Sequence, residues 1–157
     1  NKCIFCFIDQ MPPGMRETLY FKDDDSRLSF LQGNYVTLTN MSEKDMNRIV
    51  RYRLEPINIS FQTTNPELRC KMLHNRFAGE ALKKVDILYQ GGIEMNGQIV
   101  LCRGVNDGEE LERSIREIFA ASAQRVGCAG WTFQVSRWIV SIRAIYKGRG
   151  KGSHSHD

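Results

Sequence analysis

The sequence contains no apolar run of the roughly 18 residues that a membrane-spanning helix needs. Its first residues, Asn1 to Cys6, lack the layout of a secretory signal. These two absences argue against an exported or membrane-embedded protein, so we expect a cytoplasmic protein without membrane contact. Methionine is also missing from position 1, which predicts that the native chain starts upstream.

The C-terminal part of the chain lacks prolines and almost all acids. The four prolines lie before residue 67, and Asp157 is the single acid after Ile118. Up to Ile118 there are 16 Lys and Arg against 17 Asp and Glu, a net charge of −1; from Phe119 there are 6 against 1, a net charge of +5. This break in composition predicts a boundary between a core, 1–118, and a tail, 119–157.

Cysteine is present in an odd number, which does not suit a disulfide framework in a cytoplasmic chain. The five cysteines are Cys3, Cys6, Cys70, Cys102 and Cys128. Metal or thiolate chemistry is therefore the function to test for them. We interpret Cys70 and Cys102 as packed thiols of the fold, since each stands alone in a helix or strand pattern.

The core alternates strand and helix signals. β-Branched runs bounded by turn residues predict strands, and capping residues before apolar stripes predict helices. The expected strands are 35–39, 57–63 and 93–102, and the expected helices run from Ser42 to just before Pro56, over 65–89 with an irregularity near Gly79, and over 109–118. Ser42 and Asp45 have the spacing of a capping box.

Strand–helix alternation predicts parallel strands joined by right-handed crossovers, which a barrel and an open sheet both satisfy. One face of each strand is apolar: Val36, Leu38, Ile57, Ile59, Phe61, Met95 and Ile99. The other face is polar: Thr37, Thr39, Asn58, Ser60, Gln62, Asn96 and Gln98. A shared polar face favours an α/β fold that forms a partial (β/α) TIM-like barrel of three to four βα units around a polar ligand. The alternative to such a barrel is a set of three amphipathic strands whose polar face is simply exposed to solvent.

Cys3 and Cys6 form a CxxC motif, which alone fits zinc, redox or cluster chemistry. Structural zinc needs two further ligands, and His74, His154 and His156 have no suitable spacing. Pro12-Pro13-Gly14 argues against the long helix that follows a thioredoxin-type dithiol. A small α/β zinc-binding or interaction module without catalysis is the alternative function.

The segment Asn1-Lys2-Cys3-Ile4-Phe5-Cys6-Phe7 resembles the end of the radical S-adenosylmethionine (SAM) signature CxxxCxΦC, whose first cysteine would stand two positions before Asn1. The blocks 3–12, 21–40, 98–102 and 104–108 resemble, in order, a bacterial group of Fe–S oxidoreductases with a PDZ-like domain, a radical SAM core and a C-terminal domain of unknown function. The resemblance covers residues 1 to 118. It implies a radical SAM type of barrel, with three thiolates holding a [4Fe–4S] cluster whose open iron chelates SAM.

The resemblance also implies the site residues. Cys3 and Cys6 would be cluster ligands, Phe5 would border the adenine, and Thr39, Asn40 and Gln98 would contact SAM. Thr39 and Asn40 stand where many relatives carry a Gly-Gly-Glu segment, which this chain lacks. The acidic run Asp23-Asp24-Asp25 is interpreted as a solvated loop, with a cation site as the alternative.

The implied parent enzyme reductively cleaves SAM, takes electrons from a reductant such as a ferredoxin or flavodoxin, and acts on a small-molecule or protein substrate. The chain itself is expected to be an inactive fragment of it.

The tail, 119–157, departs from the resemblance. Permitted codons for Gln124 to Lys151, read one nucleotide later, can encode a segment with prolines and acids that resembles the family's continuation. We therefore interpret the tail as the non-native, poorly ordered product of a frameshift. A genuine hairpin of 131–135 and 138–142 is one alternative. A less favoured one is a nucleic-acid-binding segment formed by interleaved aromatics and the basic residues Arg137, Arg143, Lys147, Arg149 and Lys151.

Overall fold

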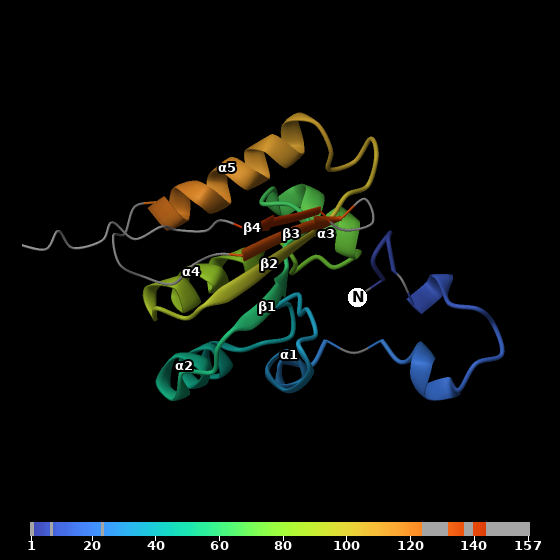
Figure 1. The fold of residues 1–157 in the computed structure, drawn as a ribbon, viewed down its shortest axis with the longest axis horizontal. Helices are drawn as coiled ribbons and strands as arrows, with labels where there is room; N and C mark the ends of the chain where they lie inside the picture. Colours follow the sequence, from blue (N-terminus) through green and yellow to red (C-terminus); the bar gives the residue numbers. More distant parts are fainter. Residues whose placement is uncertain (1, 7, 23, 124–131, 137–139, 144–157) are drawn as a thin grey trace, which may run out of the picture.

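The fold is built on one four-stranded sheet (Figure 1). A computed structural model describes residues 2–6, 8–22, 24–123, 132–136 and 140–143, with side chains described up to Ala120. The strands, in sheet order, are β1 (Ile57–Ser60), β2 (Met95–Val100), β3 (Thr132–Ser136) and β4 (Val140–Arg143). β1, β2 and β3 are parallel, and β4 runs antiparallel to β3. The α/β class is confirmed, whereas barrel closure stays a prediction.

Helices connect the parallel strands, as the alternation of signals predicted. The α-helices are α1 (Ser26–Gln32), α2 (Glu43–Tyr52), α3 (Pro66–Leu73), α4 (Lys83–Gln90) and α5 (Glu109–Ala123), and the 3-10 helices are η1 (Ile8–Gln10), η2 (Glu17–Tyr20) and η3 (Glu80–Leu82). α2 begins with the expected capping box, in which Ser42 and Asp45 bond each other's backbone N–H groups. No helix in the described part of the chain is both long and apolar enough to cross a membrane.

The segment 35–39 is not a full strand, which corrects the prediction. Val36 alone bridges to Ile59 of β1 in parallel fashion, with its N–H donating to Asn58 O at 2.9 Å. The ladder stops there because the Thr37 N–H donates to the Asp24 carboxylate at 2.7 Å and Leu38 adopts a φ of 63°. A side chain from another loop has taken the donor that a strand neighbour would use.

The segment 65–89 is two α-helices rather than one, so this prediction was also wrong in part. Asn65 caps α3 as expected, with its side chain accepting from two backbone N–H groups. α3 ends at His74, which has a φ of 46°, and α4 begins only at Lys83. The irregularity expected near Gly79 is present, because the Gly79 N–H donates to Cys70 Sγ at 3.2 Å and folds the chain back onto α3.

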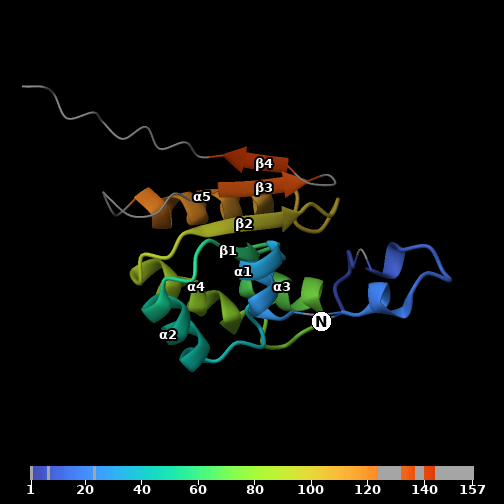
Figure 2. The same ribbon diagram turned by 60° about the horizontal axis from the view of Figure 1, so that its bottom comes forward.

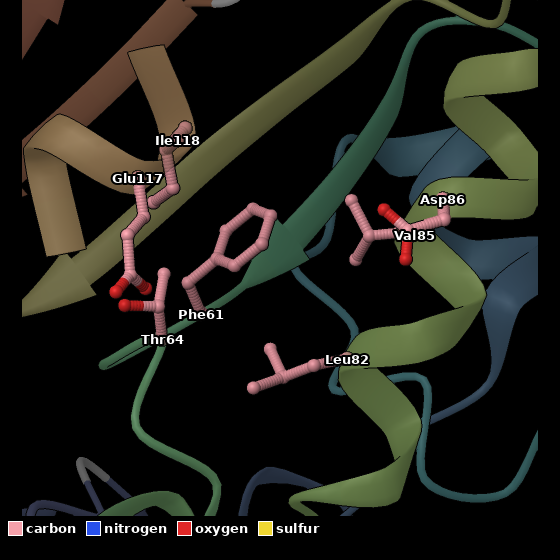
Figure 3. Close-up of a pocket in the computed structure, with 7 residues that line it drawn as sticks. All are labelled: Phe61, Thr64, Leu82, Val85, Asp86, Glu117 and Ile118. Carbon is pink, nitrogen blue, oxygen red and sulfur yellow. The ribbon is translucent and has the colours of Figure 1, made fainter. Parts of the chain in front are cut away.

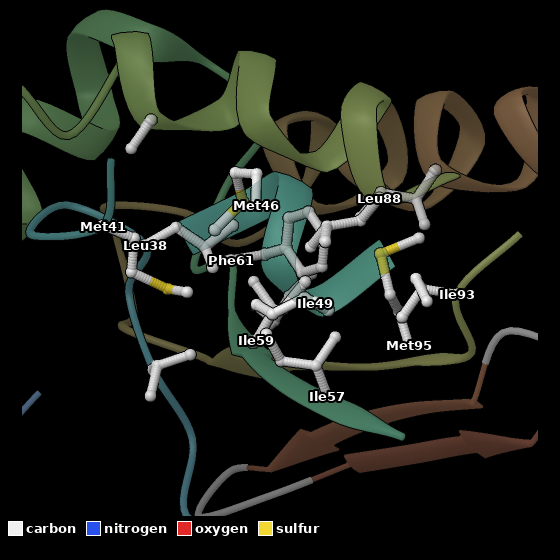
Figure 4. Close-up of a cluster of buried hydrophobic side chains, with 14 residues drawn as sticks. Leu38, Met41, Met46, Ile49, Ile57, Ile59, Phe61, Leu88, Ile93 and Met95 are labelled. Carbon is white, nitrogen blue, oxygen red and sulfur yellow. The ribbon is translucent and has the colours of Figure 1, made fainter. Parts of the chain in front are cut away.

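A buried apolar cluster holds the helices against one face of the sheet (Figure 4). The expected inward positions are all buried: Val36, Leu38, Ile57, Ile59, Phe61, Met95 and Ile99. Met46 and Ile49 of α2, Leu88 of α4 and Ile118 of α5 also belong to the cluster. Burial of each large aliphatic side chain contributes about 1.5–3 kcal/mol, so the apolar face predicted from strand parity is the one that fixes the helices.

The N-terminal segment lies beside one end of the sheet. Figures 1 and 2 both show it next to the end toward which β2 and β3 point, which is the carboxyl end of the parallel strands. This is the end at which folds of parallel strands and helices carry their ligand sites.

Candidate functional site

The two N-terminal cysteines lie on one tight turn that is anchored to the end of α3. The Cys6 N–H donates to Cys3 O at 3.1 Å, which closes the turn. The Ile4 N–H donates to Met72 O at 2.9 Å and the Lys2 N–H to Leu73 O at 3.3 Å. Both thiols are free and half-buried, so the loop presents two sulfur donors from a backbone that is fixed on both sides of Cys3.

The environment of Cys3 favours the neutral thiol. Burial raises the pKa of Cys3 above its usual value of 9.0, and the nearby Cys6 thiol and Asp24 carboxylate raise it further. A metal that binds Cys3 must therefore displace a proton, so its affinity rises with pH. Beside the turn, the Lys22 ammonium pairs with Asp9 at 2.6 Å, and hydrogen bonding to Asp9, followed by the influence of Cys6, raises the pKa of Lys22.

The Asp24 side chain holds the end of the segment 35–39, which runs parallel to β1 at Val36. Its carboxylate accepts hydrogen bonds from the Thr37 N–H at 2.7 Å, from the Thr37 hydroxyl, and from the Thr39 hydroxyl at 3.3 Å. The Asn40 side-chain amide donates to Asp24 O at 3.0 Å. Asp24 is thus half-buried and bound to the sheet end, and the solvated-loop interpretation is wrong for this residue.

Arg69 of α3, the helix whose end anchors the cysteine loop, is buried. Its guanidinium donates to four backbone carbonyls: Phe61 at 2.9 Å, Thr37 at 2.9 Å, Ser60 at 2.8 Å, and Ala78. Burial lowers the pKa of Arg69 from 12.5 to about 10, which leaves it charged at neutral pH. The Arg69 side chain therefore joins the segment 35–39, the end of β1 and the turn after α3.

The polar face of the sheet is cross-linked by side chains. The Asn96 amide donates to Asn58 Oδ1 at 2.8 Å, and the Ser60 hydroxyl donates to Gln98 Oε1 at 3.4 Å. Gln98 is half-buried on β2, one strand beyond β1. The polar face predicted from strand parity is present, and Gln98 has a partner on it.

A small cavity lies on the opposite, helix-covered side of the sheet and does not belong to this site. Its volume is about 130 Å³, and Figure 3 shows it between the end of β1, α4 and α5. Its lining is mainly apolar, from Phe61, Leu82, Val85 and Ile118. Ligand pockets usually measure about 300–1,000 Å³, so this cavity is too small for a nucleotide cofactor.

A larger polar recess lies next to Asn40. Its volume is about 460 Å³, and Asp25, Arg27, Asn40, Asp45 and Arg48 contribute to its walls. The recess opens where α1 and α2 begin, beside the Asp24 carboxylate that binds Thr37 and Thr39. It is therefore on the same side as the sheet end that carries the candidate residues.

The predicted site residues fall into three places. Cys3, Phe5 and Cys6 share the N-terminal loop, Thr39 and Asn40 share the sheet end held by Asp24, and Gln98 lies on the polar face. Across the described ranges, no group of three His, Cys, Asp or Glu side chains could hold a metal ion. Cys70 and Cys102 are engaged in turns of the fold, with Cys70 Sγ accepting from Gly79 and Cys102 N–H donating to Asn106 Oδ1 at 2.7 Å.

Two residues of this region were missed by the sequence. Arg69 and Asp24 link the strand ends, yet one stands in an ordinary helix pattern and the other in an acidic run. Neither residue carries a distinctive signal in the sequence: Arg69 is a single charge in a helix pattern, and Asp24 stands between two other acids. Helix faces carry such charges routinely.

The fold and the site define an α/β protein with a thiol-bearing loop at the carboxyl end of parallel strands. The family model for the radical SAM-like domain matches residues 1–126, and the chain belongs to this family. The match extends past Ile118, where the resemblance was expected to end, and covers all of α5. No curated protein matched the chain.

Proposed function

We propose that this chain is the cluster- and SAM-binding core of a radical SAM enzyme. The observation that supports this most directly is the position of the Cys3–Cys6 loop at the carboxyl end of the sheet in a radical SAM-like domain.

The donor set suits two of the three thiolate positions of a [4Fe–4S] cluster. Cys3 and Cys6 lie on one turn with free, half-buried thiols, and thiolates are the ligands that such clusters require. The third thiolate would come from the residue two positions before Asn1, as in the signature. When bound, the cluster supplies the electron that cleaves SAM to methionine and a 5′-deoxyadenosyl radical.

The chain's own residues would bind and orient SAM. The Thr39 hydroxyl, the Asn40 amide and the Asp24 carboxylate offer hydrogen-bonding groups and a negative charge to the amino acid part. The Phe5 ring offers a face for the adenine, and the Gln98 amide offers a further hydrogen-bonding group on the polar face of β2. Asp24, Thr39, Phe5 and Gln98 are half-buried, which reduces competition from water, whereas Asn40 is exposed.

Anaerobic reconstitution of the protein expressed from its complete gene tests the proposal. We expect about four irons per chain, a brown colour and a spectrum that changes when SAM is added. Cys3→Ala and Cys6→Ala should each lose the cluster, because two thiolates cannot replace three. Cys102→Ala is the matched control and should keep it, since this thiol lies in the β2–α5 turn.

A different metal content would contradict the proposal. Stoichiometric zinc without a cluster would favour a zinc-binding module, and so would a complete gene that encodes no cysteine two positions before Asn1.

A further inference from the structure

Cys3 and Cys6 occupy the first and fourth positions of a single hydrogen-bonded turn. The Cys6 N–H donates to Cys3 O at 3.1 Å, and Ile4 and Phe5 form the turn between them. Such a turn brings the Cα atoms of its first and fourth residues within about 7 Å of each other. Disulfide bonds usually join residues whose Cα atoms are about 4.4–6.8 Å apart. The backbone of this turn therefore suits a disulfide between the two cysteines.

Hydrogen bonds on both sides hold this turn in place. Next to Cys3, the Ile4 N–H donates to Met72 O at the end of α3, at 2.9 Å. After the turn, the Asp9 N–H donates to Cys6 O at 3.2 Å. Because the fold already restricts the loop, closing a ring between the two cysteines costs less conformational entropy than it does in an unfolded chain.

The other two cysteines of the described chain lack a partner of this kind in their own turn. Cys70 lies in α3, where its sulfur accepts from the Gly79 N–H at 3.2 Å, and Cys102 follows β2. Neither has a second cysteine within three residues. Among the described residues, no group of three His, Cys, Asp or Glu side chains could hold a metal ion. Chemistry that needs two neighbouring sulfurs and no further ligand therefore suits the cysteine loop.

We propose that Cys3 and Cys6 form a reversible disulfide, which makes the loop a redox-sensitive dithiol when no metal is bound. The oxidant is a small disulfide such as oxidised glutathione. The thiolate of one cysteine attacks a glutathione sulfur, and one glutathione leaves as its thiol. The thiolate of the other cysteine then attacks this mixed disulfide and releases the second glutathione. The two cysteines lose two protons and two electrons in total, and the two released glutathione thiols carry them.

The disulfide would keep both sulfurs from binding iron, because clusters take thiolates as ligands. Assembly of a cluster would then require a thiol reductant to reopen the loop. This consequence rests on the proposed function, whereas formation of the disulfide does not.

Thiol mapping on the metal-free 157-residue chain tests the proposal. The chain is equilibrated with reduced and oxidised glutathione, its free thiols are alkylated, and the products are mapped by mass spectrometry. We expect the loss of two of the five thiols, with the disulfide between Cys3 and Cys6. Cys3→Ser and Cys6→Ser should each stop at a mixed disulfide with one glutathione, because the turn then holds no second sulfur. Cys102→Ser is the matched control and should form the internal disulfide as the wild type does.

The same equilibration in concentrated guanidinium separates the effect of the fold from that of the sequence spacing. We expect the ratio of internal disulfide to glutathione adduct to be about tenfold higher in the folded chain, because the fold restricts the loop. An equal ratio, glutathione on both sulfurs of the wild type, or pairing of Cys3 or Cys6 with another cysteine overturns the proposal. Formation of the disulfide by a protein that never takes up a cluster supports this inference and contradicts the proposed function.

Discussion

At the scale of single residues, the candidate site depends on charges that stand outside the recognisable motif. Cys3 and Cys6 stand out in the sequence as a CxxC motif that resembles the radical SAM signature, whereas the contacts of Asp24 and Arg69 became visible only in the folded chain. Both act through contacts with residues far away in the sequence. The Asp24 carboxylate reaches Thr37 and Thr39, and the Arg69 guanidinium reaches Thr37 O.

The Asp24 carboxylate gives a prediction about SAM recognition. Asp24→Asn should weaken SAM binding about 10- to 100-fold, because a hydrogen bond to a charged group is worth about 1.5–3 kcal/mol. Binding of 5′-methylthioadenosine, which lacks the amino acid part, should not change. Equilibrium dialysis of both ligands against the reconstituted protein measures the difference.

Asp25→Asn provides the control for this comparison. Asp25 caps α1 through its bond to the Arg27 N–H at 2.9 Å, so its variant should lose some stability without losing discrimination between the two ligands. Equal weakening of both ligands by Asp24→Asn would show that the residue acts only as part of the scaffold.

At the scale of helices and strands, local sequence signals predicted where helices begin better than they predicted how far helices and strands extend. Ser42 and Asn65 mark helix starts in the sequence, and the structure has α2 and α3 begin directly after them. Caps are local because a side chain bonds backbone groups two or three residues away. The break after Leu73 and the loss of the strand after Val36 depend instead on Cys70 and Asp24, which bond to backbone groups at least nine residues away.

The capping box of α2 gives a prediction with a defined pH dependence. Hydrogen bonds from the Ser42 hydroxyl and backbone lower the pKa of Asp45 below its usual 3.8. Its stabilisation is therefore present above about pH 4 and is lost as pH falls through the folded-state pKa. Asp45→Asn should lower the free energy of unfolding by about 1 kcal/mol at pH 7, and by less at pH 3.

Chemical denaturation at the two pH values measures this effect. Asn47→Ala, on the exposed part of the same helix, should change stability equally little at both. A loss for Asp45→Asn that is as large at pH 3 as at pH 7 would contradict a role for the ionised carboxylate.

At the scale of the whole molecule, the strand parity predicted which faces meet. The apolar face packs on α2, α4 and α5, and the polar face carries the Asn58–Asn96 and Ser60–Gln98 pairs. Strand parity alone could not predict whether the sheet closes into a barrel, because a barrel and an open sheet share the same alternation of apolar and polar residues. In the tail, β3 and β4 lie where the hairpin alternative expected strands. Whether the native reading frame encodes this segment is a property of the gene, which the fold does not report.

The contribution of the tail can be tested on the chain itself. The apolar cluster among the described side chains runs from Val36 to Ile118, and the family match ends at 126. If the tail is a frameshifted segment, as we propose, then a chain that ends at Ala123 should keep cooperative unfolding and lose less than about 1 kcal/mol of stability. Guanidinium denaturation of both chains gives the comparison. A loss of several kcal/mol would mean that pairing of β3 with β2 belongs to the native fold, and an intact reading frame through a matching genomic copy would lead to the same conclusion.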